Sequence, residues 1–158
     1  MRPLPAITAF LTCAALLSGC GTDRPPSTTS TATSKDCSQN GKYPPSPTVD
    51  QLTGLLQRGL DPDVPAADKI DLLQGGAGDP ELFNRMIPAL QQADFGVTID
   101  GVTDYCNGTA NAAATLRFSG QTNESQVPLA AEDGRWKLDR LWTCALATNL
   151  QQTSPICP

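Results

Sequence analysis

The chain has 158 residues, with 11 Lys and Arg against 16 Asp and Glu, no histidine and six cysteines. Its formal net charge of −5 argues against nucleic-acid binding, which needs a basic surface, and against electrostatic docking on anionic lipid. The lack of histidine removes His-based acid–base catalysis, Ser-His and Cys-His nucleophile pairs and most transition-metal sites, so we expect no cofactor and no metal.

A short apolar segment at the N-terminus ends in Leu17-Ser18-Gly19-Cys20, a pattern typical of a bacterial lipobox. Arg2 supplies the charged start of a signal peptide, and the run from Leu4 to Leu17 supplies its apolar part. The run is shorter than the about 20 residues of a transmembrane helix. We therefore predict a signal peptide at residues 1–19 and diacylation of Cys20, with the mature protein anchored on the extracytoplasmic face of the cell membrane.

Residues 20–46 are predicted to form a tether, and residues 47–158 one folded domain. The run from Pro25 to Thr31 is rich in Ser, Thr and Pro, and it has too little apolar surface to offset the entropy of ordering. Its plain role is to hold the domain away from the bilayer, and its hydroxyls are candidates for O-glycosylation.

Four cysteines remain beyond Cys20, namely Cys37, Cys106, Cys144 and Cys157. An even number in an exported chain favours two disulfides. A zinc site of four thiolates is the alternative, but it would lack any closely spaced cysteine pair. The sequence allows three pairings. We favour Cys144–Cys157, which closes a short local loop, and Cys37–Cys106, which would fasten the N-terminal segment to the sheet.

Three helices are expected in the first half of the domain. Thr48 and Gln51 form a capping box ahead of apolar residues at helical spacing, and Gly59 can close this first helix in a left-handed conformation. A second, short helix follows and ends at Gly75-Gly76. Asp79-Pro80 is predicted to begin the third helix, and Pro88 is expected to kink it or end its regular hydrogen bonding. Its buried face would carry Leu82, Phe83, Met86, Ile87 and Leu90.

After Gly96 the apolar period changes to two, which predicts strands. Asn107-Gly108 is a strong hairpin signal, and alternating apolar residues follow it. Pro128 indicates an edge or a bulge in the next strand, and Trp136 and Leu138 share one face of another. Helices followed by an antiparallel meander of about four strands predict an α+β fold, with the N-terminal helices packed on one face of a curved sheet.

The chain from Thr48 to Gln151 resembles the C-terminal domain of the low molecular weight secreted antigens of mycobacteria and their relatives. The stretches that carry the resemblance are QLTGLL, LDPDVPAADKIDLLQGG, VTIDGV and DGRWKLDR. The resemblance implies a small α+β domain of cystatin/NTF2-like style and supplies no catalytic residues. The lipobox and the paired cysteines depart from the soluble secreted members, so free secretion does not carry over.

Several residues could carry chemistry, and each also has a plainer explanation. Gly75-Gly76-Ala77-Gly78 follows a helix and lacks a following lysine, so we interpret it as a helix end and not as a phosphate loop. Lys69 is interpreted as part of a surface ion pair. Trp136 is expected in the core, whereas Trp142 could be exposed or line a ligand cavity. Four aspartates could bind calcium but lack EF-hand spacing: Asp61, Asp63, Asp68 and Asp71.

The function expected from these patterns is a non-enzymatic binding or accessory module of the cell envelope. Its partner would be an unknown envelope protein or an apolar molecule, held between the helices and the sheet. An NTF2-like enzyme is the first alternative, with Asp100, Asp104 and Tyr105 as its strand-borne candidates. A cystatin-like protease inhibitor is the second, with Gln126-Val127-Pro128 as its hairpin.

Overall fold

The structure is a computed structural model that describes Cys37 and residues 41–158. The predicted signal peptide, Cys20 and the Ser/Thr/Pro-rich run lie outside these described residues. Within them, none of the helices combines the length and the hydrophobicity that crossing a bilayer would require.

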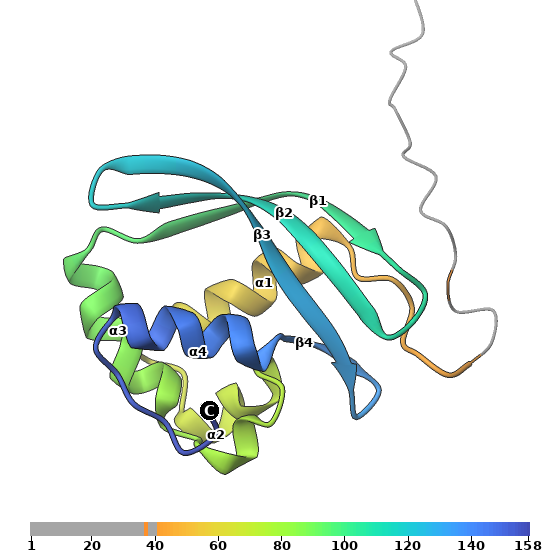
Figure 1. Cartoon of the computed structure of the whole chain (residues 1–158), viewed down its shortest axis with the longest axis horizontal. Helices are drawn as coiled ribbons and strands as arrows, with labels where there is room; N and C mark the ends of the chain where they lie inside the picture. The colour runs from red at the N-terminus through yellow and green to blue at the C-terminus, as the bar shows by residue number, and fades with distance from the viewer. Residues whose placement is uncertain (1–36, 38–40) are drawn as a thin grey trace, which may run out of the picture. The chain divides into compact units, whose positions relative to one another are not determined.

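The fold is α+β, as predicted, with four α-helices and one four-stranded antiparallel sheet in the described part of the chain (Figure 1). The strands follow the order β1-β2-β3-β4, so each pairs with its neighbour in the sequence. The elements are α1 (Val49–Leu60), α2 (Ala66–Lys69), the 3₁₀ turns η2 (Ile70–Leu72) and η3 (Gly76–Gly78), α3 (Leu82–Gln92), β1 (Gly96–Asp104), β2 (Thr109–Phe118), β3 (Gln121–Glu132), β4 (Arg135–Leu138) and α4 (Arg140–Asn149).

Helix α1 begins as predicted and extends past Gly59, the residue that was expected to close it. The Gln51 N–H donates to Thr48 Oγ1 at 3.2 Å, and the Thr48 N–H donates to Gln51 Oε1 at 2.9 Å, which completes the capping box. Gly59 does not close the helix, because α1 continues to Leu60. The glycine instead allows close packing, since a Cβ there would lie 3.3 Å from Leu72 Cδ1.

Helix α3 differs from its prediction at its start and at its proline. It begins at Leu82 and not at Pro80, with Glu81 as its N-cap, and the Asp79 carboxylate is paired with the Arg85 side chain. Pro88 lies inside α3 without ending it, and the helix continues to Gln92. The predicted apolar face is confirmed, since all five of its residues are buried: Leu82, Phe83, Met86, Ile87 and Leu90.

The sheet presents a floor of small residues to helix α1. Ala110, Ala112 and Ala114 alternate along β2 and are each at most 2% exposed. The bulge lies in β1, between Ile99 and Gly101, and not at Pro128. β3 is an interior strand, and Pro128 lies just beyond its last pair with β4, where its carbonyl accepts a hydrogen bond from the Asp139 N–H at 3.0 Å.

Helix α4 follows β4 directly and was not predicted. Asp139 caps it by accepting a hydrogen bond from the Trp142 N–H at 2.9 Å. Its buried Ala147 belongs to the same core as α1, α3 and the sheet. The C-terminal tail is then tied back to α4 by the Cys144–Cys157 disulfide.

Residues 41–47 form an N-terminal strap along one end of the sheet. Tyr43 packs on Gly108, where an added Cβ would lie 2.6 Å from Tyr43 Cε1. The Pro45 carbonyl accepts a hydrogen bond from Trp136 Nε1 at 2.8 Å, and Ser46 Oγ donates to Asp104 Oδ2 at 2.6 Å. With the Cys37–Cys106 disulfide, contacts of the described residues with the domain therefore begin at Cys37.

Candidate functional site

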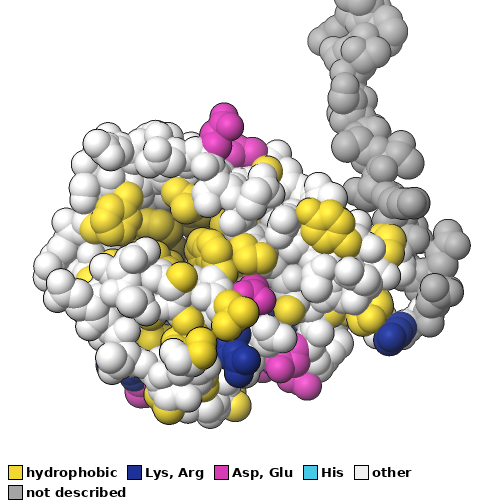
Figure 2. All heavy atoms as spheres, viewed as in Figure 1, with side chains coloured by type: hydrophobic (Ala, Val, Ile, Leu, Met, Phe, Trp, Pro, Cys, Tyr) yellow, Lys and Arg dark blue, Asp and Glu magenta, His cyan; other side chains and the backbone are white. Residues whose placement is uncertain are grey.

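An apolar cavity lies among α1, α3 and α4. The volume in which the centre of a water-sized sphere can lie inside this cavity is ≈ 30 Å³. Figure 2 shows hydrophobic side chains gathered around a hollow on this face of the molecule. The lining consists of Leu55, Leu56, Gly59, Leu60, Leu72, Phe83, Met86, Leu90, Phe95, Leu138, Trp142, Thr143 and Leu146.

The lining offers almost no side-chain hydrogen-bonding capacity. Thr143 and Trp142 carry the only side-chain oxygen and nitrogen atoms of the lining; the Thr143 hydroxyl donates to the Asp139 carbonyl at 2.9 Å, and no polar atom is exposed to the cavity. Of the two alternatives considered for Trp142, exposure or lining a cavity, the structure favours the second, since Trp142 is half-buried and lies in the lining. A polar ligand would lose its hydrogen bonds to water here, whereas a hydrocarbon would not.

A second, narrower gap, with no room for a water molecule, lies beneath α1 and shares lining residues with the first. It is bounded by Leu55, Leu56 and Leu138, which also line the first cavity, and by residues of the sheet floor such as Ala112. The small alanine side chains leave this gap under the helix. The apolar lining therefore extends from α3 and α4 to the face of the sheet.

Lys69 is buried and does not form the surface ion pair that was expected. It is 0% exposed, and its Nζ donates to the Asp61 carbonyl at 2.6 Å and to Asn84 Oδ1 at 2.9 Å. Burial lowers the pKa of Lys69 below its usual value, against the opposing charges of Asp61 and Glu81. The lysine thus joins the end of α1 to α3, a structural role.

The four aspartates considered for calcium do not form a ligand cluster. Asp61 Oδ1 accepts a hydrogen bond from the Asp63 N–H at 2.8 Å, and Asp71 pairs with Arg135. Among the described residues, no three of these aspartates bring carboxylate oxygens within 4.8 Å of one another. The glycine run does not end a helix as interpreted, because α2 and η2 end earlier, at Lys69 and Leu72. Gly76–Gly78 forms the 3₁₀ turn η3, and Gly75 precedes it in a left-handed conformation, with its N–H donating to Glu132 Oε2 at 3.0 Å.

The three candidate catalytic residues lie away from the apolar cavity. Asp100 is exposed in the β1 bulge and accepts a hydrogen bond from Thr115 Oγ1 at 2.8 Å. Asp104 is half-buried and accepts from Ser46 and from the Cys106 N–H. Tyr105 is 51% exposed. None of the three lines a cavity around α1.

The residues considered as an inhibitor hairpin are not in a hairpin loop. Gln126-Val127-Pro128 lies inside β3, and Val127 is 1% exposed in the core. Pro128 follows Val127 at the point in β3 where the pairing with β4 ends. The expectation of a protruding inhibitor loop at these residues is wrong.

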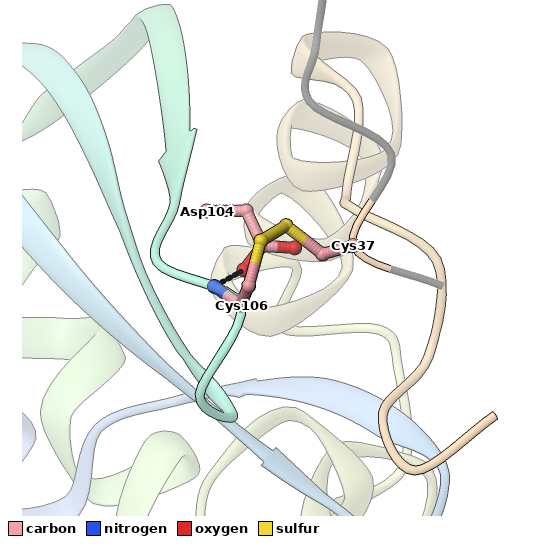
Figure 3. Close-up of side chains that lie close together, drawn as sticks. All are labelled: Cys37, Asp104 and Cys106. Carbon is pink, nitrogen blue, oxygen red and sulfur yellow. Dashed lines mark hydrogen bonds between the residues drawn. A yellow bond between two sulfur atoms is a disulfide. The ribbon is translucent and has the colours of Figure 1, made fainter. Parts of the chain in front are cut away.

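Both disulfides follow the favoured pairing. Cys37 is bonded to Cys106 and Cys144 to Cys157. Figure 3 shows Asp104 beside the first bond, with its carboxylate accepting a hydrogen bond from the Cys106 N–H at 2.8 Å. The two sulfurs and the Asp104 oxygen lie within 4.8 Å of one another, but sulfurs joined in a disulfide are not thiolate ligands.

A third space, polar and open, adjoins the apolar cavity and was missed by sequence reasoning. Its volume is ≈ 360 Å³, and Arg58 and Arg135 contribute to its wall. They come from α1 and β4, and nothing in the spacing of the two residues indicates that they share a site. The recurrence of Gly54 and Arg58 on one face of α1 is the only local signal.

The α+β fold and its disulfide bonds define a small domain of the extracytoplasmic type. The model of one protein family matches residues 45–154, and it is described as the C-terminal domain of the low molecular weight antigen MTB12. Because the match spans more than half of the chain, the chain belongs to this family. A search of curated proteins finds no match. The resemblance inferred from the sequence is confirmed.

Proposed function

We propose that this protein is a lipid-anchored lipoprotein of the cell envelope whose domain binds an apolar molecule and does not catalyse a reaction. The observation that carries the proposal is the cavity among α1, α3 and α4, in which no polar atom is exposed to the free space. Such a site favours hydrocarbon over polar ligands.

Export is supported by the paired cysteines and by membership of an antigen family. The membrane anchor is supported by the lipobox sequence ending at Cys20. Two or three acyl chains there would hold the protein durably, whereas one chain alone anchors only marginally.

The absence of catalysis is supported by where the acidic candidates lie. Asp100 faces solvent, and both Asp104 oxygens are used, one by Ser46 Oγ and one by the Cys106 N–H. A general base in this fold would need to reach a ligand inside the cavity. Neither carboxylate lines it.

The test is mass spectrometry of whatever co-purifies with the protein from its native membrane fraction. Two leucines of α4 give a matched pair of variants: Leu146 lines the cavity, and Leu141 is 58% exposed. Leu146→Asp should lose the co-purifying apolar compound, because the carboxylate would be desolvated beside it. Leu141→Asp should retain it. Equal retention by both variants, with equal abundance, would contradict the proposal.

A further inference from the structure

Three spaces meet around helix α1, and Leu55 lines all of them. Leu72 also lines both the apolar cavity and the open, polar space. Only these two side chains are shared by the apolar cavity and the open space. We call the open space the arginine mouth, bounded by Gln51, Gly54, Leu55, Arg58, Asp71, Leu72, Arg135 and Trp136.

The arginine mouth carries two guanidinium groups with donors to spare. Among the described residues, the side chain of Arg58 makes one long hydrogen bond, from Nη2 to the Asp68 carbonyl at 3.4 Å. Arg135 pairs with Asp71 through Nη1. Since a guanidinium has five N–H donors, both side chains can still bind an anion. The wall also opens at Gly54, where an added Cβ would meet no atom within 4 Å.

The charges that line the mouth favour a ligand with one negative charge. Two arginines and one aspartate leave one positive charge uncompensated, because Arg135 is already paired with Asp71. A carboxylate carries one negative charge, whereas a phosphate monoester carries about 1.5 to 2 at neutral pH. A carboxylate therefore matches the mouth more closely.

The lining of the apolar cavity indicates the chemical class of the rest of the ligand. A peptide segment would bring N–H and C=O groups that need partners, and no polar atom of the lining is exposed to the cavity. A hydrocarbon chain needs none. The ≈ 30 Å³ open to the centre of a water-sized sphere exceeds the about 10–15 Å³ that one water needs on this measure, but it is far too little for a long hydrocarbon chain. A chain can therefore enter only if the residues around the cavity move apart, and Leu55 and Leu72 lie where it would pass.

We propose that this site binds a long-chain carboxylate, with its head group at Arg58 and Arg135 and its chain passing Leu55 and Leu72 into the apolar cavity. The inference rests on the proposed function and adds the class of ligand and its orientation. The head group exchanges water for charge-assisted hydrogen bonds, and the chain is buried among α1, α3 and α4.

The experiment measures displacement of a fluorescent fatty acid from the full chain carrying Cys20→Ala, so that no acyl chain of its own competes. Palmitate should displace the probe, and Arg58→Glu should weaken palmitate about tenfold or more, because a charge-assisted contact is lost. Hexadecanol, which has the same chain without a charge, should bind wild type and Arg58→Glu equally. Arg140→Glu is the matched control, since Arg140 is an exposed arginine that lines none of the three spaces. Arg58→Gln tests the same contact without reversing the charge.

Each contrary result overturns a different statement. If palmitate and hexadecanol both bind and Arg58→Glu and Arg58→Gln weaken neither, the head-group assignment is wrong and the apolar site stands. If hexadecyl phosphate displaces the probe more strongly than palmitate, the choice of a carboxylate is wrong. If neither palmitate nor hexadecanol binds, the proposed function falls together with this inference.

Discussion

The Asp79 carboxylate and the Arg85 guanidinium form a two-pronged ion pair at the start of α3, with N–O distances of 2.9 and 2.6 Å. The same pair holds the C-terminal tail, because Ser154 Oγ donates to Asp79 and Arg85 donates to the Thr153 carbonyl at 3.0 Å. Asp79 is 9% exposed, so this contact is largely shielded from water. The tail is thus fixed by a polar contact to α3 as well as by its disulfide to α4.

We expect Asp79 to contribute to acid sensitivity. Its hydrogen bond with Arg85 lowers the pKa of Asp79 against the effect of burial, with help from Ser154. A carboxyl whose folded pKa is lowered stabilises the fold above its unfolded pKa, near 3.8, and this stability is lost as the pH falls through the folded value. Asp79→Asn should cost about 2 kcal/mol at neutral pH and flatten the acid dependence. Urea unfolding at several pH values measures both. An unchanged acid profile would contradict this role.

Trp136→Ala should be among the most damaging substitutions. Trp136 is 8% exposed in the core, and deleting a buried aromatic side chain typically costs about 3–5 kcal/mol. Trp136→Phe should cost less, because it mainly removes the hydrogen bond from Nε1 to the Pro45 carbonyl. Chemical denaturation gives both values. Asp100→Asn serves as the control at an exposed position and should change neither stability nor complementation of a deletion strain; a stable but inactive Asp100→Asn protein would favour an enzyme.

Lys69→Met should destabilise the fold at neutral pH by about 1–3 kcal/mol, because the Asp61 carbonyl and the Asn84 side chain lose their donor. The folded pKa of Lys69 is lowered by burial, so between that value and 10.5 the unfolded chain binds more protons. Wild-type stability should therefore rise with pH in this interval relative to Lys69→Met. The difference between the two proteins isolates Lys69 from Lys137, whose hydrogen bonds to Asp133 and Glu132 outweigh burial and raise its pKa. A pH-independent difference would mean that the pKa of Lys69 is the same in the folded and unfolded states, which would contradict its lowering by burial.

The disulfides should be complete in the exported protein. Alkylation of the unreduced, unfolded mature chain should add no mass, and tryptic peptides should link Cys144 with Cys157. Cys157→Ser should lower stability by about 3 kcal/mol on the chain-entropy model for a loop of this length. A peptide that joined Cys106 to Cys144 would overturn the pairing.

The anchor is tested by Cys20→Ala. Metabolic labelling with an alkyne fatty acid should mark the wild-type protein and not the variant, because the thiol is the proposed acylation site. The variant should be released or remain unprocessed. Label that persists in Cys20→Ala would rule out this lipobox.

Sequence reasoning succeeded where the signals are local. The capping box at Thr48, the apolar face of α3, the Asn107-Gly108 turn and the strand alternation involve residues close in sequence. It missed α4 because the N-cap residue Asp139 is the only local sequence signal for that helix, and it directly follows a short strand. It placed Lys69 on the surface because the hydrogen-bond partner of its buried ammonium group, Asn84, lies on another helix. The arginine mouth depends likewise on elements that meet only in the folded chain.

The Cys37–Cys106 bond also determines how a mechanical load would travel through the molecule. A pull that arrives from the N-terminal side reaches Cys37 first and passes through the covalent bond into the hairpin between β1 and β2 (Figure 3). The strap at residues 41–47 lies in the closed loop beyond that point, so its contacts through Tyr43, Pro45 and Ser46 carry little tension. A pulling force applied on the N-terminal side would therefore leave the packing around Trp136 undisturbed until the β1–β2 hairpin unfolded.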